Sequence, residues 1–228
     1  MRIVFLNVWE GKLCDAVVEF IKEQSVNTDI FCFQELSDDI REITKDILSD
    51  YEMIFFRKII DENEHFSQAT FVRKNIQIQS SGILLGEKAV CGAAIYVEIK
   101  YHNQPLYICN LHGTSNPGKK IDTPERLKQS RVPIDFFKEK EASVIIGGDF
   151  NLFSDTKSVQ MFEKNGYKNL INDFNIQTTR NHYAWDLYPE PYYHSDYVFV
   201  RSDSLNIMGF SVPQNEVSDH LPLILEIE

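Results

Sequence analysis

Apolar runs and helical patterns alternate over the first fifty residues. Residues 2–9 (RIVFLNVW) and 29–36 (DIFCFQEL) are apolar at nearly every position, which is typical of buried strands. Between them, residues 13–24 carry apolar side chains at helical spacing and predict a helix. Ser37 followed by Asp38 predicts a second helix, because a capping hydroxyl and an acidic first turn both stabilise a helix N-terminus. This β-α-β-α order predicts a sheet with helices against a face.

The pattern then changes, and strands follow one another up to residue 112. They are predicted over residues 51–58, 69–74, 76–85, 93–101 and 105–112. Strict alternation of apolar and polar side chains is clearest over residues 94–100.

A further helix is predicted to begin near Thr123, which can cap it, with Pro124 in the first helical position. Pro133 is expected to bend or interrupt this helix. A buried strand over residues 143–151 (SVIIGGDFN) ends in polar residues, and a short helix is expected at 156–165. Three strands, at 195–200, 206–212 and 221–227, close the chain.

These elements predict a two-sheet α/β sandwich with helices on the outside. No repeat, low-complexity tract or linker interrupts the 228 residues, so one domain over residues 1–228 is expected. Hydrophobic residues make up 43% and charged residues 25%, which excludes a disordered or fibrous chain. No apolar run reaches the roughly 20 residues of a membrane-spanning helix, and the stretch at 3–8 is too short for a signal peptide.

The cysteines bear on the expected cellular location, and the net charge bears on the expected substrate. Cys32 and Cys109 lie in apolar runs, and the four cysteines show no CxxC spacing. They predict reduced core thiols and a cytoplasmic location. The net charge of −11 argues against a protein that grips long duplex DNA through its phosphates. A local basic patch can still hold one phosphate.

Polar and ionisable residues recur where apolar strands end or begin. They are Asn7, Glu35, His112, Asp149, Asn151, Asp196, Asp219 and His220. Buried carboxylates and imidazoles are costly unless they are paired or bind a metal. Several of them at equivalent places predict one shared site.

The segments that carry these residues resemble the endonuclease/exonuclease/phosphatase superfamily, the fold of the DNase I-like nucleases, and within it a compact bacterial subgroup. The resemblance rests on FLNVW at 5–9, FQEL at 33–36, NLHG at 110–113, GGDFN at 147–151, SDYVFV at 195–200 and SDHLP at 218–222. Each pattern is short, but their order and spacing together are specific. The resemblance implies a four-layer α/β/β/α sandwich of two mixed sheets, with the site at one edge of the paired sheets.

The resemblance also implies a divalent cation, Mg²⁺ with Mn²⁺ as an alternative, because a hard cation prefers oxygen ligands. Glu35 matches the principal metal ligand of the family. Asn7 matches the asparagine that positions that carboxylate or the metal, and Asp219 matches a further carboxylate near it. An ordinary strand-end acid in a surface salt bridge is the local alternative for Glu35.

Five residues take catalytic roles by the same resemblance. Asp149 would orient or deprotonate the attacking water, and Asn151 would bind a phosphate oxygen or the metal. The local alternative for this pair is an Asx turn. His220 would contact the scissile phosphate, with Asp196 raising its pKa. His112 would act near the leaving oxygen as general acid or phosphate clamp, unless it is a satisfied buried histidine.

Three features outside these motifs concern substrate contacts. Residues 119–131 are basic and would either cover the site or form a solvated helix face. Residues 182–194 are rich in tyrosine, and they would either stack on a base or sugar or pack an irregular loop. Arg73 is the nearest candidate for the family's phosphate-binding arginine, but its surroundings fit loosely.

The leading functional hypothesis is a metal-dependent phosphodiesterase or nuclease that cleaves P–O bonds of nucleic-acid ends or short single strands. One alternative acts on a small-molecule or lipid phosphate ester. Another is a non-catalytic protein that binds a partner through the same fold, which predicts losses at the site. No matched position is lost. A monomer without membrane contact is expected.

Overall fold

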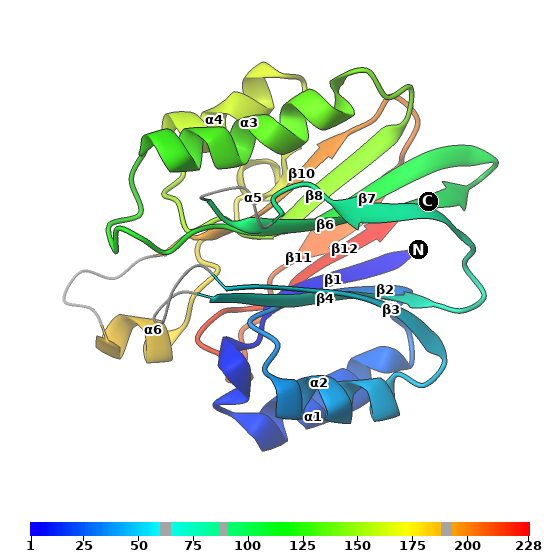
Figure 1. The fold of residues 1–228 in the computed structure, drawn as a ribbon, viewed down its shortest axis with the longest axis vertical. Coiled ribbons are helices and arrows are strands. Elements are labelled where there is room, and N and C mark those ends of the chain that lie inside the picture. The colour runs from blue at the N-terminus through cyan, green and yellow to red at the C-terminus, as the bar shows by residue number, and fades with distance from the viewer. Residues whose placement is uncertain (60–64, 87–90, 188–192) are drawn as a thin grey trace.

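Two sheets lie face to face between layers of helices in the computed structural model of the chain, which describes residues 1–59, 65–86, 91–187 and 193–228 (Figure 1). Helices α1 (Cys14–Ser25) and α2 (Asp38–Ile47) cover the outer face of one sheet. Helices α3 (Pro124–Lys138) and α4 (Lys157–Lys164) cover the outer face of the other. The predicted four-layer α/β/β/α sandwich is therefore confirmed.

The first sheet has the strand order β11-β12-β1-β2-β4-β3. Its strands are β1 (Arg2–Asn7), β2 (Ile30–Gln34), β3 (Tyr51–Ile59), β4 (His65–Arg73), β11 (Ile207–Ser211) and β12 (Leu223–Ile227). β1 is parallel to β2 and antiparallel to β12, so the sheet is mixed. The last two strands of the chain thus join the sheet formed by the first four.

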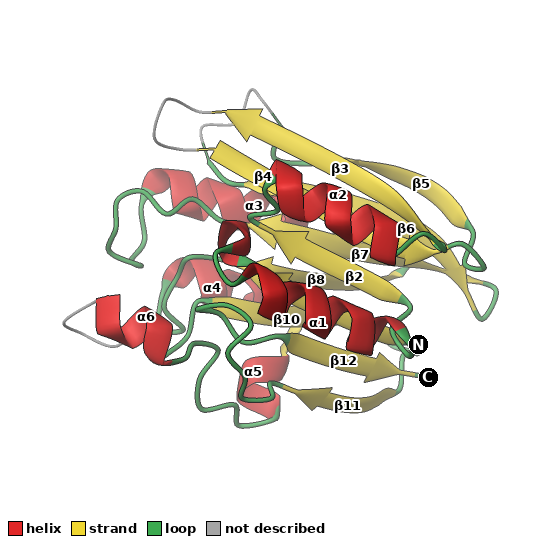
Figure 2. Ribbon diagram, turned by 90° about the horizontal axis from the view of Figure 1, so that it is seen from below, coloured by secondary structure: helices red, strands yellow, loops and turns green. Residues whose placement is uncertain are grey.

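The second sheet has the order β5-β6-β7-β8-β10-β9. Its strands are β5 (Ile78–Ile83), β6 (Ala93–Tyr101), β7 (Gln104–His112), β8 (Ser143–Asp149), β9 (Lys168–Asn169) and β10 (Asp196–Arg201). β7 and β8 are parallel, whereas β10 is antiparallel to β8. Short elements complete the fold: a 3-10 turn (Trp9–Gly11), α5 (Leu170–Asp173) and α6 (His182–Leu187). In Figure 2, α6 lies beyond the strand ends, at the opposite end of the molecule from the two termini.

Apolar side chains on alternate positions of β1 pack on opposite sides of their sheet. Phe5 belongs to the core between the sheets, whereas Leu6 belongs to the core beneath α1 and α2, where Phe20 and Ile40 contribute. Burial on both faces explains why the pattern of this strand is continuously apolar. Cys32 is a free thiol within the core, as predicted.

The predicted helix that begins at Thr123 is present, and Thr123 Oγ1 accepts a hydrogen bond from the backbone N–H of Arg126. It continues through Pro133 to Lys138, so of the two expected effects, a bend or an interruption, the interruption was wrong. Burial of Pro133 and Phe137 against the second sheet stabilises the last turns. Among the described residues, no helix is long and apolar enough to cross a membrane.

Polar contacts join the sheets just beneath their edge. Asn110 on β7 is fully buried, and its amide donates to the backbone oxygens of Phe33 and Ala69 in the first sheet. Its Oδ1 accepts from Nε2 of Gln34 at 2.6 Å. Gly147 lets the sheets approach closely, because a Cβ there would lie 2.8 Å from the ring of Phe5. These contacts fix the distance between the two strand edges that carry the predicted site.

Candidate active site

The strand registers bring the predicted residues to one edge of the sandwich. Asn7 ends β1, and Glu35 directly follows the parallel strand β2. His112 ends β7 and is paired with Asp149, which ends the parallel strand β8. Asp196 begins the antiparallel strand β10 and is also paired with Asp149. Carboxyl ends of parallel strands and the start of an antiparallel neighbour share an edge, so these residues meet.

One amide connects carboxylates from the two sheets. Nδ2 of Asn7 donates to Oε1 of Glu35 at 2.9 Å and to Oδ2 of Asp149 at 3.1 Å. Its Oδ1 accepts from the backbone N–H of Trp9, which fixes the orientation of the amide. Glu35 has a left-handed φ of 53°, which turns the chain away from the buried strand. Its side chain is 30% exposed and lines a cleft, whereas Asn7 is fully buried.

Asp149 is buried and accepts hydrogen bonds on both oxygens. Oδ1 accepts from the backbone N–H of Asn151 at 2.9 Å, which is the predicted Asx-turn contact. Oδ2 accepts from Nδ2 of Asn151 at 3.2 Å, in addition to Asn7. Burial works to raise the pKa of Asp149, but the positive charges of His220 and Lys120 outweigh it and hold that pKa well below its ordinary value. The carboxylate is therefore ionised at neutral pH.

His220 forms a buried pair with Asp196. Its Nδ1 lies 2.8 Å from Oδ1 of Asp196, whose other oxygen accepts from the hydroxyls of Thr179 and Ser195. Its Nε2 lies 3.6 Å from Oδ2 of Asp149. Burial and a neighbouring guanidinium lower the pKa of His220, but the surrounding carboxylates, Asp196 first among them, raise it above the ordinary 6.5. The arrangement favours an imidazolium that faces Asp149.

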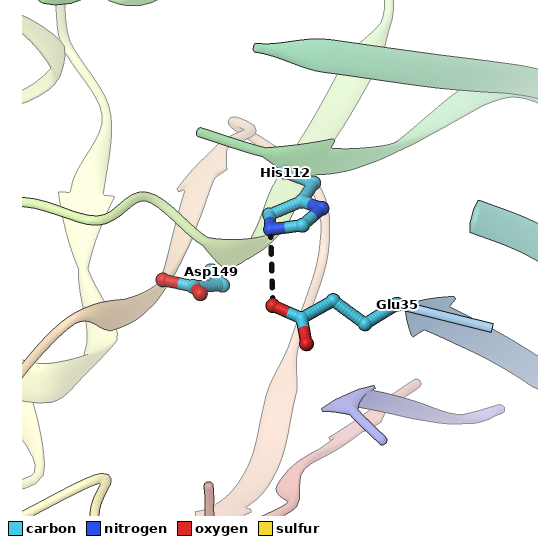
Figure 3. A group of neighbouring side chains, drawn as sticks. All are labelled: Glu35, His112 and Asp149. Atoms are coloured by element: carbon cyan, nitrogen blue, oxygen red, sulfur yellow. Dashed lines mark ion pairs between the residues drawn. The ribbon is translucent and has the colours of Figure 1, made fainter. Parts of the chain in front are cut away.

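His112, at the end of β7, lies next to Glu35 in the site. Its Nε2 lies 3.6 Å from Oε1 of Glu35, and the dashed line in Figure 3 marks this ion pair. Its ring forms an edge-to-face contact with Phe66, with 5.0 Å between the centroids. Nδ1 is buried without a hydrogen-bond partner among the described residues. His112 therefore does not match the alternative of a satisfied core histidine.

Lys120 is a buried cation of the site that arrives from the basic segment. Its Nζ donates to Oδ1 of Asn151 at 2.7 Å, and burial lowers its pKa while Asp149 opposes that shift. Arg126, also fully buried, donates to backbone carbonyls of the loop over residues 114–121. The basic segment is thus partly internal: one arginine holds the loop that carries Lys120. Lys128 is exposed on α3. Its position agrees with the alternative prediction for this segment, a solvated helix face.

Arg180 is the functional candidate that the sequence did not indicate. It is buried, its Nη2 pairs with Oδ2 of Asp219, and its Nη1 contacts both the ring of His220 and Oγ of Ser195. It follows no apolar strand, so no pattern marked it, although the preceding Thr179 supports Asp196. Arg73, the arginine considered from the sequence, lies elsewhere and pairs with Asp50.

Most of the predicted site residues line a single cleft of about 310 Å³. The predicted residues on its wall are Glu35, His112, Asp149, Asn151, Asp219 and His220, joined by Lys120 and Arg180. Asn7 and Asp196 are not among the lining residues and support them through hydrogen bonds. Trp9, Phe66 and Arg57 also line the cleft.

The aromatic segment is only partly described. The ring of Tyr183 on α6 lies 6.3 Å from that of Trp9, and Trp185 lies 5.8 Å from Tyr193. Tyr188 and Tyr192 lie outside the described residues. The choice between base stacking and loop packing stays open for this segment.

The donor set fits a divalent cation. Glu35, His112 and Asp149 each offer an atom within 4.8 Å of the others, and Figure 3 shows their side chains converging. Two carboxylates that share one Asn7 amide repel each other, and a cation would offset that repulsion. Mg²⁺ suits the oxygens, and Mn²⁺ also accepts an imidazole nitrogen.

Comparisons with known proteins identify the family and the fold of the chain. The profile described as "Endonuclease/Exonuclease/phosphatase family" matches residues 5–220 of the chain. No curated protein sequence matches it.

Solved structures share the fold at low sequence identity. D. rerio TDP2 complexed with a single-strand DNA product superimposes with a TM-score of 0.76 at 18% identity, covering 100% of this chain and 98% of that one. The human Nocturnin catalytic domain gives 0.77 at 18%, covering 100% and 93%. The Bacteroides thetaiotaomicron mannosyl-6-phosphatase gives 0.75 at 17%, covering 100% and 99%. At these identities the likeness concerns the fold alone.

Proposed function

Because the chain belongs to the endonuclease/exonuclease/phosphatase family, we propose that it hydrolyses phosphate esters in the cleft around Asp149 with the help of a divalent cation. One arrangement carries this proposal: the ionised Asp149 lies between two amides and 3.6 Å from the Asp196-supported imidazole of His220. A carboxylate beside a positively charged donor suits water activation on one side and phosphate binding on the other.

Glu35 and Asp149 would hold the cation, positioned by Asn7. Asp219, assigned to the metal from the sequence, borders the same centre but is engaged by Arg180. When bound, the cation would neutralise charge on the phosphate and lower the pKa of a water molecule.

The roles of the other residues follow from their contacts. Asp149 accepts the proton of the attacking water, which bonds to phosphorus as the P–O bond to the leaving group breaks. His220 donates to the oxygens on which negative charge develops, and Asn151 holds Asp149 and Lys120 in place beside them. His112 supplies a proton to the leaving oxygen. Asp196 keeps the ring of His220 oriented and charged.

We propose a phosphodiester at a nucleic-acid end or in a short single strand as the substrate, in the cytoplasm. Trp9, Phe66 and Arg57 line the cleft in addition to the residues around Asp149, so a substrate larger than one phosphate group can contact it. Its volume of about 310 Å³ suits a nucleotide rather than a long duplex. The overall charge of −11 also disfavours long duplex DNA. The similarity to TDP2 in complex with single-strand DNA supports this choice.

A small phosphomonoester is the second candidate. The mannosyl-6-phosphatase shares the fold over the whole chain, and the cationic side chains of Lys120 and Arg180 are suited to a dianion.

A substrate panel with Mg²⁺, Mn²⁺ or EDTA tests the proposal. It contains bis-(p-nitrophenyl) phosphate, p-nitrophenyl phosphate, a labelled single strand, a duplex and an abasic duplex, with Asp149→Ala and His220→Ala as controls for contaminating nuclease. Metal-dependent turnover that both variants abolish is expected, and the best substrate decides between diester and monoester. Turnover unchanged in both variants, or no turnover and no metal binding by a folded protein, would contradict the proposal.

A further inference from the structure

We infer that Arg180 is a phosphate-binding residue, and that in the absence of substrate Asp219 occupies the side of its guanidinium that the substrate's phosphate takes. This inference rests on the proposed phosphoesterase function and names a residue that the motifs do not include. It makes Asp219 and the phosphate competitors for one cation.

Backbone hydrogen bonds hold the chain on both sides of Arg180, independently of its side chain. Arg180 and His220 form an antiparallel bridge, and the backbone N–H of Leu221 donates to the oxygen of Thr179 at 2.8 Å. Nδ2 of Asn181 donates to the oxygen of Ser218 at 2.6 Å. Since these bonds hold both sides of Arg180, a change of its side chain leaves the local chain path in place.

The guanidinium faces the part of the cleft where the phosphate would lie. Arg180 lines the cleft beside Asp149, Asn151 and His220, although its side chain is only 6% exposed. A guanidinium offers five N–H donors and no acceptor. Its Nη1 contacts the ring of His220, which places the guanidinium and the imidazole side by side in the cleft. An oxyanion bound there can accept from the guanidinium and, when the ring carries both protons, from His220 as well.

One donor of Arg180 is unsatisfied. Nε is buried without a hydrogen-bond partner among the described residues, while Nη2 pairs with Oδ2 of Asp219. Nε and Nη2 lie along one edge of the guanidinium, the edge that binds planar or tetrahedral oxyanions with two parallel bonds. Asp219 uses only Nη2, so the resting pair is incomplete. A phosphate with several oxygens can satisfy both donors and also meet His220.

The chemistry of the site favours phosphate as this acceptor. Asp219 is bonded by Arg180 and also by the hydroxyl of Ser218 at 3.3 Å, so it keeps a partner when Arg180 turns to a phosphate. Lys120 lines the same cleft, where its amino group offers a second donor to an anion. An arginine fork next to a buried lysine is a common way to bind phosphate oxygens.

Binding of inorganic phosphate to the whole protein in EDTA, measured by calorimetry, tests the inference without requiring turnover. Arg180→Lys keeps the charge and removes the fork, so we expect phosphate to bind at least about tenfold more weakly, or roughly 1.4 kcal/mol. Arg201→Lys is the matched control, because Arg201 donates to backbone oxygens of Phe137 and Lys140 outside the cleft. Its phosphate affinity should equal that of the wild type.

The Asp219→Asn variant should change the phosphate affinity in the opposite direction. Removing the competing carboxylate should tighten phosphate binding severalfold. This gain should disappear in the Arg180→Lys background, because Asp219 and the phosphate then no longer compete for a guanidinium. A gain that persists in that background would instead reflect general removal of negative charge.

Three results would overturn the inference: wild-type protein that binds no phosphate, Arg180→Lys protein that binds phosphate as tightly as the wild type, or an Asp219→Asn gain that persists with Lys at position 180. If Arg180→Lys protein does not fold, an unchanged or weaker affinity of the Asp219→Asn variant overturns it. Arg180-dependent phosphate binding without turnover on any ester would refute the proposed function while leaving this inference intact.

Discussion

Nδ1 of His220 lies 2.8 Å from Oδ1 of Asp196, although Asp196 begins a strand of the second sheet and His220 precedes a strand of the first. The pair therefore forms only when the two sheets are packed together. Since Asp196 is further held by Thr179 and Ser195, its carboxylate has little freedom to leave the imidazole.

The fall of kcat/KM at high pH should depend on the pair of His220 and Asp196. The carboxylates raise the pKa of His220 above 6.5, so the imidazolium is present below the raised value and activity falls as the pH rises through it. The stabilising effect of the protonated ring is complete below about pH 6.5 and is lost over the same rise. Asp196→Asn removes one of the carboxylates that raise this pKa. The alkaline limb of kcat/KM for bis-(p-nitrophenyl) phosphate should then move to lower pH.

Asp203→Asn is the control for that measurement, because Asp203 is exposed and away from the cleft. Its profile should coincide with that of the wild type. An unchanged alkaline limb in the Asp196→Asn protein would show that His220 does not set it.

Asp149→Asn should lower kcat by roughly 10²–10⁴ with little change in fold, since the amide is nearly isosteric but cannot accept the proton of water. Single-turnover kinetics and circular dichroism provide the measurement. Asp173→Asn, at an exposed position, serves as the control. Retention of the wild-type rate would exclude Asp149 as the base.

Glu35→Gln should weaken binding of Mn²⁺ at least about tenfold, because a neutral amide replaces a carboxylate of the donor set. Titration followed by the paramagnetic signal of free Mn²⁺ measures this without any turnover. Glu52→Gln, on exposed β3 surface, should bind as the wild type does. Equal affinities for the two variants would place the metal elsewhere.

Asn110→Ala should reduce the free energy of unfolding by about 2 kcal/mol or more, because buried oxygens of Phe33 and Ala69 lose their donor. Urea denaturation gives the value, with Asn165→Ala as the exposed control. Activity should fall as well, since Asn110 helps to set the spacing of the sheets under the site. A change below about 0.5 kcal/mol would mean that water replaces these bonds.

Arg57→Ala tests whether the substrate extends along the cleft. Arg57 lines the same cleft and forms an exposed pair with Asp38, so its loss should hardly affect stability. KM for a labelled single strand should rise several-fold, whereas KM for p-nitrophenyl phosphate should stay constant. Equal effects on both substrates would argue against an extended diester.

The sequence by itself determined the layers and most of the polar residues that gather at one edge of the sandwich. The continuous apolar pattern of residues 2–9 required burial on both faces, which a sheet between helices and a second sheet provides. Polar residues directly after apolar strands, such as Glu35 and Asp149, are costly to bury alone, so a shared site followed from their positions.

Only the tertiary structure decided which loops complete that site. β12 pairs with β1 across more than 200 positions of sequence, and this pairing carries His220 to Asp149. Arg180 reaches the cleft from an irregular loop, where no periodicity marks a residue, and Lys120 enters because Arg126 folds its loop inwards. Local patterns report burial and spacing along the chain, whereas long-range strand pairing and buried polar bonds depend on geometry that is set only when the sheets meet.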